Sequence, residues 1–574
     1  MHVNTKKSYF TLLFSTLTFQ CISASEDVIV RTKFGDVSGF THKTEDGFEA
    51  SAFLGVPYAK PPLGNYRFEK PEPLSSWKPE TIDAKKLAPS CSPVSRELFK
   101  RISNHSEDCL YLNIITPKQT SNEPLPVFVF IHGGAFVLGS PESYGYDKPV
   151  DDFVRHGVIF VTIAYRLGPF GFFSTGDSVM PGNLGLWDQT RALLFLHDIL
   201  PDFGGDPERI TLSGQSAGSA SVSAHLFSPH SDHLFSQAIQ FSGSLFSEWA
   251  INDEVIGESK ELAKALRCDT SSSEAIHECM KKQDFEAIMD KLGRQPTFHA
   301  SPRLTRFNPR VDNDFFPYKL EDMVRKAPKK KTLNFVTDME SAIFVVLPIV
   351  PSYVPKEKWT SYTSEDLLDY IRDNVVTHDE FARRTSPFFI ELRDFYLYRD
   401  NQNTSAFYLT RLAELISDLQ FNVPIVHEVE LKRLHGWDTY FAVIDYESET
   451  TRDKDVPIRG AVHSAEHRFI FKYYGLENVP MDENDKKFKH HLLNGILSFI
   501  KTGEPKSGSI EWPKVSDEHP MRNLRVRPEP VISDEFRPEA IKFWTQRVPE
   551  VVGHDLLKKT RLPSTVARQK HTEL

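Results

Sequence analysis

Residues 211–225 read TLSGQSAGSASVSAH, and this stretch decides the fold class. Most of its side chains are small, and Ser216 lies between Gly214 and Gly218 in the pattern G-x-S-x-G. That pattern is typical of a sharp strand-to-helix turn that presents a serine at the edge of an α/β sheet. Glycines two residues before and after the serine avoid a collision across the turn, and the small residues that follow suit a helix packed close to the sheet. The pattern also occurs in ordinary glycine-rich turns, so its context matters.

Apolar segments around the turn supply that context. Residues 126–132 (PVFVFIH) and 158–166 (VIFVTIAYR) are near-continuous apolar runs, typical of strands buried on both faces of a parallel sheet. Shorter strands are predicted at 209–214 and 237–243. Residues 183–200 have helical spacing and predict a helix with four buried leucines. These are Leu186, Leu193, Leu194 and Leu196.

Two helical insertions interrupt the alternation of strands and helices. Residues 253–292 and 365–419 have mostly helical patterns, and strand-like residues 332–337 and 439–445 follow them. The sequence therefore predicts an α/β-hydrolase fold: a mostly parallel central sheet with right-handed crossovers, helices on both faces and helical insertions. We expect one such domain over residues 25–555.

The first 24 residues have the order of a secretory signal peptide. Lys6 and Lys7 form a basic start, residues 9–19 are mainly apolar, and small residues follow at 23–25. The apolar run is too short to span a bilayer core of ~30 Å, and we expect no later membrane anchor. The formal net charge is −10 and becomes −10 − 2 = −12 without the two lysines. A mildly acidic chain gives no electrostatic reason to bind nucleic acid.

The predicted tail, residues 556–574, ends in HTEL. These four residues resemble the KDEL and HDEL signals that a receptor reads to return proteins to the endoplasmic reticulum. We therefore expect a protein of the endoplasmic reticulum lumen with the retrieval receptor as a partner. Secretion is the alternative, because the second residue departs from the commonest form.

The cysteines agree with an oxidising compartment. Cys21 leaves with the signal peptide, and Cys91, Cys109, Cys268 and Cys279 remain. Four cysteines suggest two disulfides in one of three pairings, of which two short loops are the simplest. Glycosylation sequons occur at Asn104 and Asn403.

The segment HGGAF, residues 132–136, follows a predicted strand. At this place an α/β-hydrolase loop supplies backbone N–H groups that stabilise an oxyanion. Gly134, Ala135 and Ala217 are the predicted donors, each worth about 10²–10³-fold in rate. Ser216 also needs a base to take its proton. The pattern cannot select that base among 21 histidines; it predicts only that an acidic residue and then a histidine follow the serine.

The chain resembles the type B carboxylesterases, a family that includes liver carboxylesterases, cholinesterases and non-catalytic adhesion relatives. The resemblance covers about residues 28–544. Besides the two motifs above, it rests on FLGVPYAKPPLGNYRF (53–68), SEDCLYLNI (106–114), YRLGPFGFFSTGD (165–177), PGNLGLWDQ (181–189) and GAVHSAEH (460–467). It implies a serine hydrolase that cleaves carboxylic esters of small molecules through an acyl-enzyme, with broad specificity and without a metal or organic cofactor.

The resemblance also implies the other site residues. The catalytic histidine of the family falls on His463, with His467 as the alternative in the same segment. Its acidic residue falls on Glu340 in TDMESAIF, with Asp338 as the rival. The family pairing of cysteines implies the disulfides Cys91–Cys109 and Cys268–Cys279.

Three departures from the relatives are visible. Gln215 replaces the usual glutamate before the nucleophile, and Ala135 replaces a glycine of the oxyanion loop. No tryptophan lies between Cys91 and Cys109, where cholinesterases place the one that binds choline, so choline esters are not the expected substrates. The segment HEVEL (427–431) has leucine where a zinc-binding HExxH motif needs a second histidine.

Two other functions stay open at this point. One is a catalytically inactive, cholinesterase-like adhesion or binding scaffold, although such relatives typically lose the serine or the histidine. The other is a lipase or a cholinesterase-like enzyme, because the insertions that shape the substrate pocket are poorly defined by sequence.

Overall fold

The structure is a computed structural model that describes residues 27–91, 104–119, 121–294, 298–299, 303–348, 350–376, 386–400, 402–471 and 479–552. The predicted signal peptide and the terminal HTEL lie outside these residues. Among the described residues, no helix is long and apolar enough to cross a membrane.

Thirteen strands of the described chain form one sheet. Its centre is parallel, and its seven strands in spatial order are β9 (Ile159–Ile163), β8 (Leu125–Ile131), β10 (Gly205–Gln215), β11 (Gln237–Phe241), β12 (Lys331–Thr337), β13 (Thr439–Ile444) and β16 (Asn523–Val526). Antiparallel strands extend both edges: β7 (Tyr111–Pro117), β3 (Glu49–Pro57), β2 (Asp36–Lys43) and β1 (Asp27–Arg31) beside β9, and β17 (Val531–Ser533) beside β16. The short β4 (Thr81–Asp83) pairs with β2. The predicted mostly parallel sheet is therefore present, with antiparallel edges that the sequence patterns did not indicate.

Both faces of the central strands are buried because successive side chains enter different cores. Along β8, Val127 and Val129 belong to one apolar cluster, whereas Phe128 and Phe130 belong to another. Helices α3 (Leu184–Ile199) and α4 (Ala217–Phe227) cover the first face, and α15 (Glu483–Thr502) covers the second. This explains why the strands read as continuous apolar runs.

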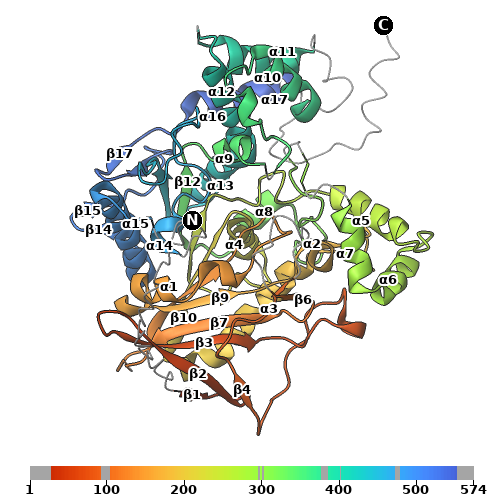
Figure 1. The fold of residues 1–574 in the computed structure, drawn as a ribbon, viewed down its shortest axis with the longest axis vertical. Helices are drawn as coiled ribbons and strands as arrows, with labels where there is room; N and C mark the ends of the chain where they lie inside the picture. Colours follow the sequence, from red (N-terminus) through yellow and green to blue (C-terminus); the bar gives the residue numbers. More distant parts are fainter. Residues whose placement is uncertain are drawn as a thin grey trace, which may run out of the picture.

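The two insertions are helical, and Figure 1 shows them as separate projections of the molecule. The first comprises α5 (Glu254–Ala265), α6 (Ser273–Lys282) and α7 (Phe285–Gly293). The second comprises α10 (Ser364–Tyr370), α11 (Pro387–Arg393) and α12 (Ser405–Ser417). The flanking helices α9 (Ala342–Val346) and α13 (Val423–Leu434) lie nearer the centre of the molecule, and α13 packs into the main core. The second insertion has its own apolar core, to which Trp544 and Val548 near the end of the described chain contribute.

One predicted burial is wrong. Leu186, Leu193 and Leu196 of α3 are fully buried, but Leu194 is 38% exposed. Adjacent residues of a helix differ by about 100° in direction, so Leu193 and Leu194 cannot share one face. The predicted strand 158–166 is also shorter than expected, because β9 ends at Ile163.

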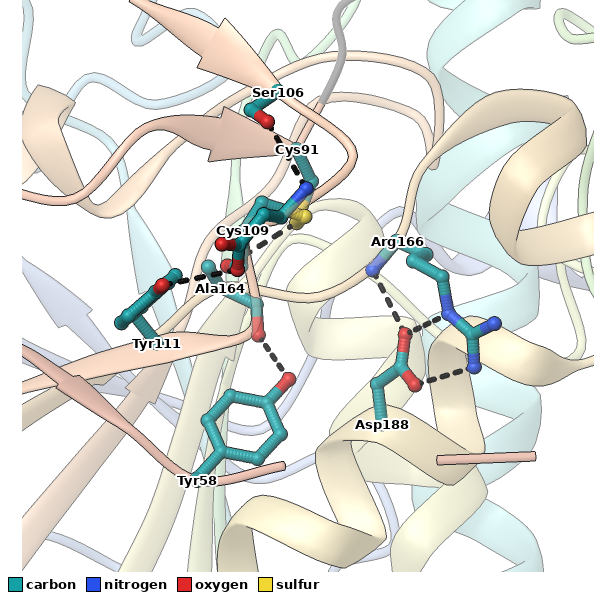
Figure 2. Close-up of a disulfide and its surroundings, with 9 residues drawn as sticks. Tyr58, Cys91, Ser106, Cys109, Tyr111, Ala164, Arg166 and Asp188 are labelled. Atoms are coloured by element: carbon teal, nitrogen blue, oxygen red, sulfur yellow. Dashed lines mark hydrogen bonds and ion pairs between the residues drawn. A yellow bond between two sulfur atoms is a disulfide. The ribbon is translucent and has the colours of Figure 1, made fainter. Parts of the chain in front are cut away.

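A buried ion pair holds residues 164–166, which follow the end of β9. Figure 2 shows Arg166 and Asp188 facing each other below the disulfide Cys91–Cys109. Arg166 Nε and Nη2 each lie 2.7 Å from an oxygen of Asp188, which is the fifth residue of α3. The pair joins the carboxyl end of β9 to this helix. The second disulfide joins Cys268 to Cys279, so the structure contains both pairings that the resemblance implied.

Candidate active site

Ser216 lies in the turn between β10 and α4 with φ 58° and ψ −122°. This region of backbone space is strained for a residue with a side chain, and it is found mainly at functional sites. The turn is held by its neighbours: the Ser216 N–H donates to the Phe241 carbonyl at 2.8 Å, and its carbonyl accepts from the Ala220 N–H at 2.9 Å. The predicted strand–turn–helix context of G-x-S-x-G is therefore present.

Glycines surround this turn because backbone occupies the space of their missing side chains. A Cβ on Gly214 would lie 2.3 Å from the Gly218 carbonyl oxygen, which is the predicted collision across the turn. A Cβ on Gly218 would lie 2.0 Å from the Ile131 carbonyl oxygen of β8. Sequence reasoning missed Gly243, where a Cβ would lie 2.2 Å from the Ser216 carbonyl oxygen. Its signal is the glycine just after β11.

His463 and Glu340 face each other in the buried interior. The two residues are 7% and 0% exposed, and His463 Nδ1 lies 2.6 Å from Glu340 Oε2. The second carboxylate oxygen accepts from the Thr337 N–H at 2.8 Å, and the His463 N–H donates to the Glu340 carbonyl at 3.0 Å. Because a carboxylate only accepts hydrogen bonds, Nδ1 carries the proton and Nε2 is left unprotonated.

The rival acid, Asp338, has a different partner. Its Oδ1 accepts from the Ala461 N–H at 2.7 Å, so it fastens the segment that carries His463. Burial raises the pKa of Asp338 to about 7. The structure thus brings Glu340 rather than Asp338 to the imidazole.

His467, the alternative histidine, lies in an apolar and aromatic setting at the start of α14 (His467–Ile470). Burial, helped by the charge of His463, lowers the pKa of His467 to about 3, so its ring is neutral. The preceding Glu466 is also buried, and burial with the nearby Glu340 raises its pKa to about 8. Sequence reasoning missed this carboxyl group, although it belongs to the GAVHSAEH motif.

Gln215, the residue before Ser216, reaches the unprotonated nitrogen of His463. Its amide Nε2 lies 3.0 Å from His463 Nε2 and donates to Ser464 Oγ at 2.7 Å. In the described part of the chain, no hydrogen bond joins Ser216 to His463. The contact nevertheless brings the proton-accepting nitrogen to the residue next to Ser216.

The segment 132–136 packs directly on the turn that carries Ser216. A Cβ on Gly133 would lie 2.6 Å from the Gln215 carbonyl oxygen and 3.0 Å from the Ser216 Cβ. Gly134, Ala135 and Phe136 all have positive φ, of 118°, 54° and 62°. The segment is therefore a tight turn, a type of backbone whose successive N–H groups bind anions in other proteins.

Three N–H groups near this turn are candidates for an oxyanion hole. In the described residues, the N–H groups of Gly134 and Ala135 have no protein acceptor. Ala217 opens α4, so its N–H has no acceptor within the helix. His132, the first residue of this loop, is held by a stacking contact: its ring centre lies 4.5 Å from that of Tyr165. Burial lowers the pKa of His132 to about 4.

Aromatic side chains form an apolar wall beside His463. The Phe421 and Phe344 ring centres lie 4.6 and 5.5 Å from the imidazole centre. Phe421 belongs to a π-helical turn, Asp418–Asn422, and Trp249 donates to the neighbouring Gln420 carbonyl at 2.7 Å. An apolar wall strengthens electrostatic interactions at the catalytic groups because it excludes water.

Three further features of the sequence concern glycosylation and metal binding. Asn104 and Asn403 are both exposed, as glycan acceptors must be. In the HEVEL segment, Glu428 is buried and pairs with Lys432 at 2.7 Å. Within the described ranges, no cluster of three metal-ligating side chains occurs.

Comparison with known proteins agrees with this geometry. The sequence model of the carboxylesterase family matches residues 26–544. Gut esterase 1 of Caenorhabditis briggsae is 33% identical over 562 residues, which cover 95% of this chain and 97% of that protein. Carboxylic ester hydrolase of Bombus ignitus is 29% identical, covering 90% and 93% of the two chains. Acetylcholinesterase of Bungarus fasciatus is also 29% identical, covering 91% and 87%.

Proposed function

The chain belongs to the carboxylesterase family and is a carboxylic ester hydrolase, and from this premise we propose that it acts with the triad Ser216, His463 and Glu340. One observation carries the assignment. The buried Glu340–His463 pair leaves His463 Nε2 unprotonated, and that nitrogen contacts the residue next to the strained Ser216.

The reaction begins with a proton transfer. His463 Nε2 takes the hydroxyl proton as Ser216 Oγ attacks the ester carbonyl, and the Glu340 carboxylate stabilises the resulting imidazolium. The N–H groups of Gly134, Ala135 and Ala217 stabilise the charge that develops on the carbonyl oxygen. Collapse of this intermediate releases the alcohol, to which His463 returns the proton. Water, activated by the same nitrogen, then hydrolyses the acyl-enzyme.

The direct test uses a fluorophosphonate probe, which labels an activated serine. We expect the purified protein to be labelled at Ser216, and Ser216→Ala to lose both the label and esterase activity, a fall of about 10⁶-fold in kcat. A matched control is Ser219→Ala, on the next turn of α4, where the hydroxyl donates to the Gly243 carbonyl. It should retain labelling. A folded wild-type protein that takes up no label would instead favour an inactive binding scaffold.

For the substrate class, we propose small-molecule carboxylic esters with broad specificity. A screen of short- and long-acyl esters, with choline esters included, measures this directly. A modest dependence of kcat/KM on acyl length is expected. A steep preference for long acyl chains would indicate a lipase, and a preference for choline esters would indicate a cholinesterase-like enzyme.

For the location, we propose the lumen of the endoplasmic reticulum. The two disulfides are typical of a lumenal or secreted protein. Residues 1–24 are the proposed signal peptide, residues 25–555 one hydrolase domain, and the terminal HTEL the retrieval signal. Deletion of the last four residues should move the protein from cells to medium. Equal secretion with and without HTEL would contradict the retrieval role.

A further inference from the structure

The catalytic nitrogen of His463 has an unusual partner in the resting structure. The side-chain amide of Gln215 donates to it, and the same amide nitrogen donates to the hydroxyl of Ser464. We propose that Gln215 and Ser464 are positioning residues that hold His463 in both of its protonation states by reversing the direction of their hydrogen bonds. The inference rests on the proposed role of His463 as the base.

In the resting state, every group of this cluster has a fixed role. His463 Nδ1 donates to Glu340, so Nε2 can only accept. The two hydrogens of the Gln215 amide are both used, one toward His463 and one toward Ser464. A glutamate at residue 215 could not make this arrangement, because its carboxylate has no hydrogen to donate.

Proton transfer from Ser216 inverts these requirements. Nε2 now carries a hydrogen and needs an acceptor, and an amide N–H that points at it becomes repulsive. Rotation of the terminal torsion of Gln215 by half a turn replaces its Nε2 with its Oε1, and this torsion is broad and nearly two-fold. The oxygen can then accept from Nε2–H and from the Ser464 hydroxyl, which can donate as well as accept. Only the proton of Ser216 is transferred, and no other bond is broken.

The surroundings leave room for this rotation. Gln215 Oε1 lies 2.8 Å from the position that a Cβ on Gly133 would occupy, so the missing side chain gives the amide its space. Phe344 and Phe421, which pack on the imidazole, offer no competing hydrogen-bonding group. The titratable neighbours are Glu340, Glu466 and His467, and none of them changes in the variants below.

Whether Gln215→Leu slows or speeds acylation tests the reversal of the hydrogen bonds. If Gln215 only held the neutral ring, its removal would free Nε2, and acylation would be unchanged or faster. If Gln215 also stabilises the imidazolium, Gln215→Leu should slow it. We expect the rate of fluorophosphonate labelling and kcat/KM to fall about tenfold, with the loss in kcat rather than in KM, because a positioning residue acts on the proton transfer. A rate equal to or above that of the wild type would overturn the proposal.

Two further variants separate a shared role from independent ones. Ser464→Ala should slow acylation by roughly threefold, and its effect should disappear in the Gln215→Leu background, because the two side chains act as one unit. Gln215→Glu places a negative charge beside Nε2, which favours the protonated ring. The acidic limb of the kcat/KM profile between about pH 5 and about pH 9 should therefore move up by about one unit. Additive effects, or an unmoved limb, would contradict the proposal.

The chain provides a matched control. Gln189 is also buried, donates to the Ser221 hydroxyl at 3.1 Å and lies 2.8 Å from the Nε2 of another histidine, His225. Gln189→Leu should lower the thermal midpoint without changing the pH profile. Labelling of wild-type Ser216 distinguishes failure of the proposed function from failure of the proposed role of Gln215 and Ser464. An unlabelled wild type refutes the proposed function, whereas a labelled wild type with unaltered variants refutes only the role of Gln215 and Ser464.

Discussion

Two buried clusters of the described residues each combine a histidine, a glutamine and a serine, and they differ above all in the partner of the histidine Nδ1. At His463, Nδ1 pairs with the Glu340 carboxylate, and Nε2 contacts the Gln215 amide. At His225, in α4, Nδ1 pairs with the Ser231 hydroxyl, and Nε2 contacts the Gln189 carbonyl oxygen. The second cluster has no carboxylate, and burial lowers the pKa of His225 to about 3.

This difference supports the proposal that His463 is a base and His225 a structural residue. A neutral network can satisfy both nitrogens of His225, but nothing in it would stabilise an added proton. His463 has a buried carboxylate at Nδ1 that stabilises an added proton, so it can accept a proton and return it. Burial and hydrogen bonding alone therefore do not identify a catalytic histidine; the charge of the partner does.

Replacing each histidine should give the largest difference in kcat and in stability between the two clusters. His463→Ala removes the base, and we expect kcat to fall by about 10⁵-fold with little loss of folded protein. His225→Leu leaves Gln189 and Ser231 without their partner, so it should cost about 2–4 kcal/mol of unfolding free energy. Its kcat per labelled serine should be unchanged. Active-site titration and thermal unfolding measure the two quantities, and a His225 variant with impaired kcat would erase the distinction.

A smaller but still large effect should separate the two carboxyl groups near His463. Glu340→Gln keeps the side-chain size but removes the charge and can reverse the hydrogen bond to Nδ1. We expect kcat to fall about 10⁴-fold, as when a triad aspartate becomes asparagine. Asp338→Asn retains an oxygen for the Ala461 N–H and should change kcat by less than about threefold. The reverse ranking would make Asp338 the acid of the triad.

The fold was largely predictable because its information is local. Buried parallel strands need continuous apolar runs. The turn at Ser216 needs glycine because a Cβ on Gly214 would lie 2.3 Å from the Gly218 carbonyl oxygen. The antiparallel edge strands were not predicted, since their pairing is set by distant partners. Leu194 was assigned to the buried face, although its direction differs from that of Leu193.

The site was predictable only in part, for the same physical reason. The serine and the oxyanion loop each lie within one short motif. Glu340 and His463 are 123 residues apart, and Gln215 and His463 are 248 apart, so no local pattern joins them. The first pair came from the family resemblance. The contact of Gln215, which departs from the family pattern, and the buried state of Glu466 required the three-dimensional structure.

The smallest predicted effect concerns pH and stability. The segment that carries His463 adjoins a partly buried carboxyl group, Asp338, and a buried one, Glu466, and desolvation raises their pKa values to about 7 and about 8. A raised pKa means that the folded state binds a proton more tightly than the unfolded state does. The stabilisation from the protonated carboxyl is complete below about pH 4 and is lost as the pH rises through the folded value.

Asp338→Asn removes this dependence at one position. Relative to the variant, the wild type should therefore lose thermal stability between about pH 4 and about pH 7, and lose no more above that range. Asp485→Asn is the control of opposite sign, because hydrogen bonds from Ser448, Thr450 and Tyr446 outweigh burial and lower the pKa of Asp485. Its difference from the wild type should not decline over the same range. If the plot of thermal stability against pH for Asp338→Asn runs parallel to that of the wild type over this range, Asp338 is already ionised in the folded protein.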